Sequence, residues 1–291
     1  MRAKAFAPGH ITGFFEILDG PEDPLRRGSR GAGVNLSLGV ISSVDVREAA
    51  RQVISIRING KRTDAATTLR AVRHILGTRR LDVMVDSRLR LPVGQGFGMS
   101  ASGALSASLA LGAALGIGRL EAGGAAHRAE IDGRTGLGDV AAQLCGGWEM
   151  RLRPGYPPYG LVDRFLAPSR TIALCVCGDP VPTKSVLGDP VKRRTICRAG
   201  RHAMKKIQAS PKLEEFFSLS LGFARATGLA GDRALSLAED ITASGHGLAS
   251  VSMIGNSVFA IGRMDRIAGL MKGRGRAFFC GTDIGGARVV G

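Results

Sequence analysis

The chain has 291 residues, of which 44% are hydrophobic and 22% are charged, so it can bury one large core or two smaller ones. This composition excludes a disordered protein, and no apolar run reaches the roughly 20 residues that a membrane-spanning helix needs. The formal net charge of +16 favours anionic partners, but aromatic residues make up only 5%, which leaves few platforms for stacking nucleic-acid bases.

The first third of the chain is predicted to consist mainly of strands and turns. Apolar residues alternate at 34–40, 54–58 and 81–85, as in half-buried strands, and Asn59-Gly60 marks a turn. Helical spacing predicts a helix over 64–76, which Gly77 ends. A glycine-rich loop then leads into a predicted helix over 102–115.

The remaining two thirds mix helices and strands without strict alternation, which favours an α+β fold of packed layers over a doubly wound sheet. Helices are predicted at 121–131, 140–144, 191–208, 212–227, 233–242 and 267–272, and strands at 148–152, 171–177, 250–261 and 277–280. The Pro-rich segment Pro154–Pro158, or the connection near Pro168, is the candidate domain border. We therefore expect domains over 1–165 and 166–291.

The five cysteines do not have the spacing of a disulfide framework. Cys175 and Cys177 would lie on one face of a predicted strand, and no second pair completes a zinc site, so we expect structural thiols. The basic start Met1-Arg-Ala-Lys4 is not followed by an apolar signal region or a cleavage site, so we expect a cytoplasmic protein with no membrane partner.

The clearest functional motif is the glycine-rich loop Leu91–Ser102, between a predicted strand and a long helix. Gly94, Gly96 and Gly98 allow sharp turns and close approach to a bulky anion, and the N-terminus of the helix offers unpaired N–H groups to it. The loop lacks the Gly-Lys-Ser/Thr of a Walker motif and the glycine spacing of a Rossmann motif. A di- or triphosphate is the ligand that this pattern favours. Taken alone, the glycines are also consistent with tight helix–strand packing.

The segment Pro92-Val-Gly-Gln-Gly-Phe-Gly-Met-Ser-Ala101 resembles the phosphate motif of the GHMP kinases, usually Pro-x-x-x-Gly-Leu-Gly-Ser-Ser-Ala. Phe97 replaces the leucine and Met99 the first serine, while Ser100 matches the second serine, whose hydroxyl ligates magnesium in the family. The resemblance implies that the phosphates of ATP are bound by Pro92, Gly94, Gln95, Gly96, Phe97, Gly98, Met99, Ser100, Ala101 and Ser102.

Two further motifs extend the resemblance over nearly the whole chain. Ala7-Pro-Gly-His-Ile-Thr-Gly13 resembles the opening motif of the family, with His10 in place of its cation, and Ser252–Phe259 resembles the third motif with a reduced glycine run. Together with Gly28-Ser-Arg-Gly-Ala-Gly33, the opening motif is most similar to the archaeal pantoate kinase branch of the family. This similarity implies that the substrate is bound by His10, Thr12, Arg30, Gly255 and Asn256.

The two carboxylates of the segment 127–140 also match positions with roles in the family. The resemblance implies that Glu130 ligates magnesium together with Ser100, and that Asp139 faces the acceptor hydroxyl as the catalytic base. From the residues alone, Asp139 is equally well placed as a helix N-cap, and Glu130 as an exposed helix carboxylate.

Two side chains bear on the choice of acceptor. His10 can donate a hydrogen bond to an alcohol or a carboxylate, and Arg30, in a glycine-flanked loop, can either grip a carboxylate bidentately or extend into solvent. Of the other histidines, His74 and His202 are expected at the surface, and the role of His246 is left open.

The resemblance implies a GHMP kinase architecture, with an N-terminal ribosomal-S5-like domain 2 fold and a C-terminal ferredoxin-like domain. It also implies ATP and Mg²⁺ as cofactors, and a homodimer. The implied reaction is ATP-dependent phosphorylation of pantoate to 4-phosphopantoate in coenzyme A biosynthesis. A GHMP kinase for mevalonate, homoserine, shikimate or a sugar is the alternative. The more distant alternative is a nucleic-acid-binding protein without catalysis, which the charge suggests; we expect no nucleic-acid partner.

Overall fold

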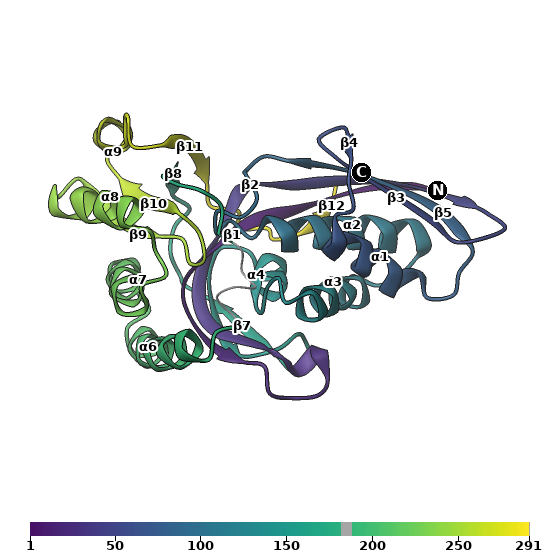
Figure 1. The fold of residues 1–291 in the computed structure, drawn as a ribbon, viewed down its shortest axis with the longest axis horizontal. Coiled ribbons are helices and arrows are strands. Elements are labelled where there is room, and N and C mark those ends of the chain that lie inside the picture. The colour runs from purple at the N-terminus through teal and green to yellow at the C-terminus, as the bar shows by residue number, and fades with distance from the viewer. Residues whose placement is uncertain (182–187, 291) are drawn as a thin grey trace.

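The computed structural model describes residues 1–181 and 188–290, and within them an α+β fold is built on two β-sheets (Figure 1). In this part of the chain the first sheet has eight strands in the order β12-β1-β2-β5-β3-β4, and β6 and β7 extend it from β2. Neighbouring strands are antiparallel, except that β3 and β5 are parallel. The strands are β1 (Arg2–Leu18), β2 (Gly28–Glu48), β3 (Val53–Ile58), β4 (Lys61–Arg62), β5 (Leu81–Leu89), β6 (Trp148–Arg153), β7 (Leu161–Arg164) and β12 (Arg288–Val289), and a short 3₁₀ helix, η1 (Pro24–Arg26), joins β1 to β2.

The alternation of apolar residues does not predict strand β1, nor the short strands β4, β7 and β12. The residues of β1 from Ala5 to Ile17 are almost all buried, because α2 packs on one part of the strand and α6 and α7 on another. A strand covered in this way has no polar face to alternate with an apolar one. The approach of α7 depends on Gly13, where a Cβ would lie 2.2 Å from Ser220 Oγ and 2.7 Å from the Phe216 ring.

Four helices form a layer against the first sheet, as the lower right part of Figure 1 shows. They are α1 (Ala66–Leu76), α2 (Met99–Leu115), α3 (Arg119–Gly133) and α4 (Asp139–Cys145). Helix α2 lies in the middle of this layer and packs against α1, α3 and the sheet, so small and apolar residues surround it on most sides. It begins at Met99, three residues before the predicted start at Ser102, because the backbone enters the helix directly after the turn at Gly98.

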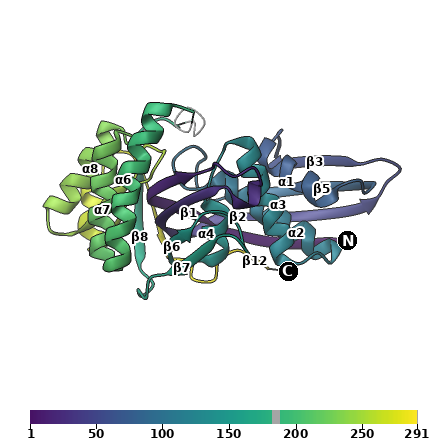
Figure 2. The ribbon, with the colours of Figure 1, turned by 90° about the horizontal axis from the view of Figure 1, so that it is seen from below.

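The second sheet contains β8 (Thr171–Val176), β9 (Gly247–Val251), β10 (Ser257–Gly262) and β11 (Arg276–Gly281), in the antiparallel order β11-β8-β10-β9. Its helices are α6 (Pro190–Ala209), α7 (Leu213–Thr227), α8 (Asp232–Ala243) and α9 (Met264–Met271). Figure 2 shows α6, α7 and α8 side by side at this end of the molecule. The first and third strands of this sheet in chain order, β8 and β10, lie in its centre. Helices α6–α8 follow β8 and helix α9 follows β10, which is the ferredoxin-like arrangement.

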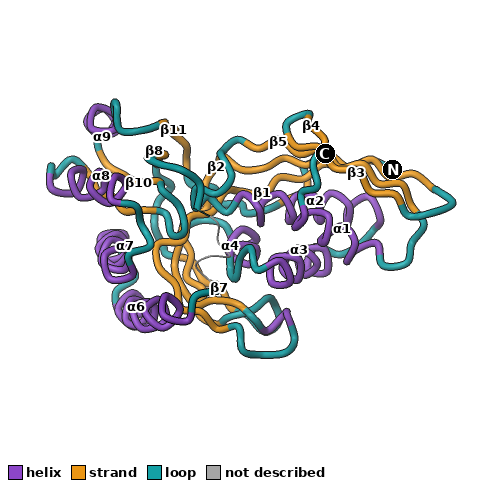
Figure 3. The backbone as a smooth tube through the Cα atoms, viewed as in Figure 1, coloured by secondary structure: helices purple, strands orange, loops and turns teal. Residues whose placement is uncertain are grey.

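The predicted strand over 250–261 is wrong in one respect. The segment is a hairpin in which β9 and β10 pair, and residues 252–256 form the turn between them (Figure 3). The sequence hides this turn because Met253 and Ile254 are apolar and Gly255 is its single glycine. Cys175 and Cys177 are free and almost fully enclosed, which is consistent with the structural thiols expected there.

The last residues of the described chain return to the first sheet. Phe6 of β1 pairs with Arg288 of β12. Before that, the backbone N–H of Gly147 donates to the carbonyl of Asp283 (2.6 Å), and the N–H of Ala287 donates to the carbonyl of Gln143 (2.8 Å). Residues 283–289 therefore brace the end of α4 and the start of β6. The division into domains at 165/166 stays a prediction.

One apolar core joins the two sheets. The Phe216 ring of α7 lies 6.0 Å from Phe14 of β1, 5.7 Å from Trp148 of β6 and 6.1 Å from Phe259 of β10, measured between ring centroids. These aromatic contacts connect elements of both sheets through a single side chain. None of the helices in the described residues is long and apolar enough to cross a membrane.

We expect Phe216→Ala to lower the free energy of unfolding by about 3–5 kcal/mol, because it leaves a cavity where the two sheets meet. Urea denaturation measures this change. The matched control is Phe279→Ala, since Phe279 is 47% exposed and should cost far less. Equal losses for the two variants would contradict the importance of this contact.

Candidate active site

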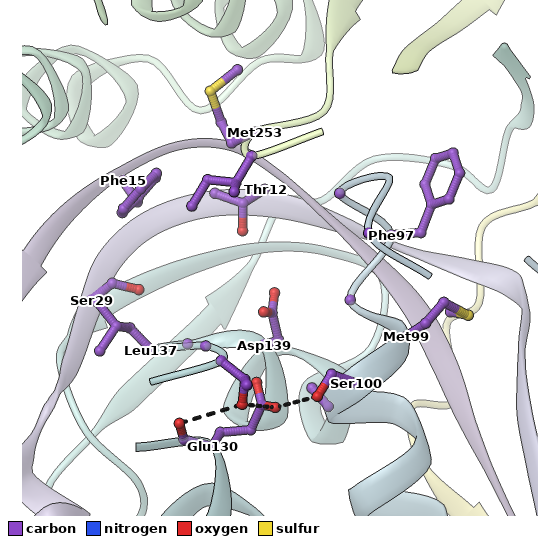
Figure 4. Close-up of a pocket in the computed structure, with 18 of the residues that line it drawn as sticks. Thr12, Phe15, Ser29, Phe97, Met99, Ser100, Glu130, Leu137, Asp139 and Met253 are labelled. Carbon is purple, nitrogen blue, oxygen red and sulfur yellow. Dashed lines mark hydrogen bonds between the residues drawn. The ribbon is translucent and has the colours of Figure 1, made fainter. Parts of the chain in front are cut away.

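A cavity of about 390 Å³ opens between the first helix layer, the middle of β1 and the β9–β10 turn (Figure 4). One part of its wall is the glycine-rich loop, with Gly94, Gly96, Gly98 and the first residues of α2. Another part is the segment 135–139 together with Glu130. The remaining wall comes from distant parts of the chain, namely Thr12, Phe15, Ser29, Val181, Met253 and Ile254.

The glycine-rich loop has the geometry of an anion site. Gly94, Gly96 and Gly98 have φ values of +76°, +75° and +62°, which glycine adopts without strain. Gly98 is the N-cap of α2, and no side chain caps this helix end. The N–H groups of the first turn therefore have no intrahelical partner, and this turn lines the cavity. A phosphate group fits such a site.

At the inner end of the cavity, three oxygen-bearing side chains meet. The Ser100 hydroxyl donates to Glu130 Oε1 (2.8 Å), and the Thr135 hydroxyl donates to the same oxygen (2.7 Å), as Figure 4 shows for Ser100. A Cβ at Gly136 would come within 2.0 Å of Glu130 Oε2, so glycine leaves room beside that oxygen. Glu130 is buried, which removes the alternative of an exposed helix carboxylate.

Burial is also the main reason that the pKa of Glu130 rises, from its ordinary value of 4.5 to about 7, and the nearby negative charge of Asp139 adds to the rise. The hydrogen bonds from Thr135 and Ser100 act in the opposite direction. A neighbouring cation would stabilise the ionised form of this buried carboxyl group and so favour the loss of its proton. The oxygens of Glu130 and Ser100 are of the type that Mg²⁺ prefers.

Asp139 is the first residue of α4, and its side chain points into the cavity between Thr12 and Glu130 (Figure 4). It does not act as an N-cap, because Gly138 holds that position and no side-chain cap bond is present. Instead, Asp139 Oδ1 lies 2.7 Å from Nδ1 of His10. The carboxylate is thus positioned by β1 and not by its own helix.

His10 is fully buried between two carboxylates. Its Nδ1 contacts Asp139, and its Nε2 lies 3.0 Å from Oε1 of Glu149. A neutral imidazole has a single N–H, so donation to both carboxylates requires the doubly protonated ring. Burial disfavours this charged form, yet the hydrogen bonds to Asp139 and Glu149 raise the pKa of His10 above its ordinary value of 6.5.

Arg151 completes this buried group of charges. Its guanidinium forms an ion pair with Glu149, and its Nη2 donates to the Thr12 hydroxyl (3.3 Å). Two cations therefore face two carboxylates, which is the balance that buried ions need. Although burial acts against ionisation of Asp139, the hydrogen bond and the charge of His10, with a contribution from Arg151, hold the pKa of this carboxyl below its ordinary value of 3.8.

Comparison with known proteins gives the family. The model of the GHMP kinases N terminal domain matches residues 63–147. A pantoate kinase of Thermococcus kodakarensis is 37% identical over 90% of this chain and 88% of its own length, and one of Methanocaldococcus jannaschii is 31% identical over 90% and 93%. The chain belongs to the pantoate kinase family of the GHMP kinases. It is thus an ATP-dependent kinase, and the resemblance seen in its motifs is confirmed.

Solved structures agree with this assignment to the pantoate kinase family. A phosphotransferase related to the CoA biosynthesis pathway superposes with a TM-score of 0.89 at 31% identity, covering 100% of this chain and 99% of the other. A homoserine kinase from Cytophaga hutchinsonii has a TM-score of 0.72 at 17% identity over 99% and 97% of the two chains. The second likeness shows the GHMP kinase fold alone, and it confirms the predicted fold class.

The structure brings most of the predicted site residues of this pantoate kinase family member together. Thr12, Gly94, Gly96, Phe97, Gly98, Met99, Ser100, Ala101, Glu130 and Asp139 all line the cavity. Pro92, Gln95 and Ser102 do not. Gln95 is buried and donates to the carbonyl of Gly178 (2.9 Å), and the Ser102 hydroxyl donates to the carbonyl of Pro8 (2.8 Å), so both hold the loop from behind.

Four of the five residues predicted to contact the substrate do not line the cavity. His10 lies behind Asp139 and outside the cavity wall. Arg30 faces away from the cavity, because its guanidinium lies 3.7 Å from Glu16 and donates to Gln208 (3.3 Å). Gly255 and Asn256 also lie outside the wall. The Asn256 amide donates to the carbonyl of Asp179 (2.8 Å) and accepts from the N–H of Gly231 (3.1 Å), which anchors the turn.

Several residues of the site are missing from the sequence prediction. Glu149 and Arg151 alternate with Trp148 and Met150 in β6, and charged residues within a buried strand are a signal that could have revealed them. Met253 and Ile254 carry no such signal, because apolar residues in a strand-like segment are ordinarily assigned to the core.

In metal-free protein, we expect the free energy of unfolding to fall as the pH rises from about 4.5 to about 7. Over this interval the folded state keeps a proton on Glu130 that the unfolded chain has lost, so each rise in pH favours unfolding. The shift in pKa corresponds to about 3 kcal/mol. Urea denaturation with a chelator present, compared between the unaltered protein and Glu130→Gln, isolates this contribution.

The Glu130→Gln variant should show a flatter dependence on pH in this interval. Asp132→Asn serves as its control, since Asp132 lies on the same helix and is exposed. An unchanged slope in Glu130→Gln would mean that Glu130 ionises normally in the folded protein.

Proposed function

We propose that the protein transfers the γ-phosphoryl group of ATP to the primary hydroxyl of pantoate, giving 4-phosphopantoate for coenzyme A synthesis. The observation that carries this proposal is the carboxyl group of Asp139, whose pKa His10 lowers, facing the same cavity as an uncapped helix N-terminus in the glycine-rich loop. The names of the relatives supply the acceptor. Pantoate is a hydroxy acid and carries a negative charge. Arg151 places a positive charge directly behind the cavity wall at Gly138, which favours such an acceptor.

In this proposal Asp139 orients the acceptor hydroxyl. Phosphoryl transfer proceeds through a loose transition state, so positioning of the nucleophile and charge stabilisation matter more than early proton removal. A carboxylate held in the ionised form by His10 accepts a hydrogen bond from the hydroxyl and receives its proton as the new P–O bond forms. His10 acts through Asp139 and is a positioning residue.

The acceptor carboxylate is assigned to Ser29, which lines the cavity, with Arg151 supplying positive charge from behind Gly138, in place of Arg30. A Cβ at Gly138 would lie 2.5 Å from Ser29 Oγ and 2.7 Å from Arg151 Nε, so both polar atoms approach the same small residue of the cavity wall. Arg151 Nε is buried and has no hydrogen-bond partner within the described protein. A substrate carboxylate beside Ser29 would gain from the positive charge of this guanidinium.

Magnesium is proposed as the cofactor, held by Ser100 and Glu130. These oxygens fit it, because they converge at the inner end of the cavity next to the space kept open by Gly136. When bound, Mg²⁺ neutralises charge on the nucleotide phosphates. The homodimer and the cytoplasmic location expected from the sequence remain proposals.

The test of the function is ADP release from MgATP with pantoate, mevalonate, homoserine and shikimate assayed side by side. We expect turnover that depends on pantoate. Preference for another acceptor would keep the kinase assignment and overturn the substrate. Nucleotide binding without turnover of any acceptor would overturn the proposed reaction.

We expect Asp139→Asn to lower kcat by about 100-fold or more while ATP still binds, because the amide can neither accept the proton nor pair with a charged His10. Steady-state kinetics and nucleotide-binding calorimetry measure the two effects. Asp132→Asn is the matched control and should keep normal kcat. Full activity in Asp139→Asn would remove this residue from the mechanism.

A further inference from the structure

Ile254, in the turn between β9 and β10, has a backbone conformation that its side chain disfavours. Its φ is +57°, in the left-handed region. Among the described residues with positive φ other than glycine, namely Asn59, Ala65, Arg134 and Ile254, it is the one with a β-branched side chain. A β-branched residue in this region is a strained exception, and such strain is typical of functional sites.

The surrounding contacts impose this conformation. The N–H of Met253 donates to the carbonyl of Thr12 (3.2 Å) in β1, and the hydroxyl of Ser257 donates to the carbonyl of Gln95 (2.5 Å) in the glycine-rich loop. Asn256 ties the other end of the turn to Asp179 and Gly231. The turn is thus fixed to four separate segments. Glycine would meet its backbone requirement at position 254 without strain, so the reason for isoleucine must lie in the side chain.

Ile254 lines the cavity together with Met253, Phe15 and Leu137. Figure 4 shows Met253 and Phe15 across the cavity from Glu130 and Ser100, with the Asp139 carboxylate between the two sides. The cavity therefore has a polar side, formed by the glycine-rich loop, Ser100 and the carboxylates, and an apolar side near Thr12. We define Phe15, Leu137, Met253 and Ile254 as the apolar wall.

We infer that Ile254 determines acceptor specificity by packing, as part of the apolar wall, against a branched alkyl carbon next to the carbon that bears the reactive hydroxyl. This inference rests on the proposed function and deepens it. Pantoate carries two methyl groups on the carbon beside its hydroxymethyl group, whereas homoserine and shikimate have no such quaternary centre. An apolar wall facing Asp139 offers those methyl groups a surface to bury, and a glycine at position 254 would leave a gap there.

The experiment compares kcat/KM for pantoate with kcat/KM for 2,4-dihydroxybutanoate, which has the same carboxylate and hydroxyl groups but lacks both methyl groups. In Ile254→Gly the preference for pantoate should fall about tenfold or more, the scale for lost methyl contacts in a pocket. The kcat/KM for 2,4-dihydroxybutanoate and the KM for ATP should change little. Ile254→Val keeps the branched Cβ and should lower the preference by a smaller factor.

The matched control is Asn59→Gly, because Asn59 has a φ of +49° in an exposed turn outside the cavity wall. Asn59→Gly removes the strain of a left-handed backbone conformation at a position outside the cavity. The preference of this variant for pantoate should equal that of the unaltered protein. If Ile254→Gly fails to fold, Ile254→Val decides the question.

Three results would overturn the inference. An unchanged preference in both Ile254 variants would show that the side chain does not contact the branched carbon. An equal loss for both acceptors with a raised KM for ATP would place Ile254 on the nucleotide side. Absence of pantoate turnover in the unaltered protein would overturn the proposed function, and the inference with it, so the two failures are distinguishable.

Discussion

The site depends on one buried imidazole. His10 places a positive charge between Asp139 and Glu149, and each of these carboxylates belongs to a different element, α4 and β6. Without a cation at this point, two carboxylates would be enclosed with Arg151 as their single buried partner in the described structure, and one of them would take up a proton. The ionised state of Asp139 is therefore a property of the whole group and not of the aspartate alone.

This arrangement explains why β1 is long and enclosed. The strand carries His10 and Thr12 to the middle of the molecule, where the helix layer of the first sheet lies on one part of it and α6 and α7 lie on another. The glycine-rich loop is held to the same strand, because the N–H of His10 donates to the carbonyl of Phe97 (2.9 Å). The glycine-rich loop, Asp139 and the β9–β10 turn are thus all hydrogen-bonded to residues 10–12 of β1. These shared contacts keep their relative positions fixed.

The sequence predicts those parts of the molecule that depend on residues close together in the chain. The glycine-rich loop, the helices α6–α8 and the pairing of Ser100 with Glu130 follow from motifs and periodicity, the last through family resemblance. The partners of His10 lie 129 and 139 residues away, so nothing beside His10 in the chain indicates them. The direction in which Arg30 points is hidden from the sequence for the same reason, because its partner Gln208 lies 178 residues away. Strand β1 is missed because its burial removes the alternation on which a prediction relies.

The bracing of α4 by residues 283–289 has a consequence for the order in which the protein matures. During synthesis, β1, the glycine-rich loop and Asp139 leave the ribosome long before the segment that supports the far end of α4. The pairing of β1 with β12 closes a loop of nearly the whole chain, the slowest type of contact to form. A nascent chain can therefore acquire its phosphate loop early, but the far end of α4 is braced only after residues 283–289 have been made.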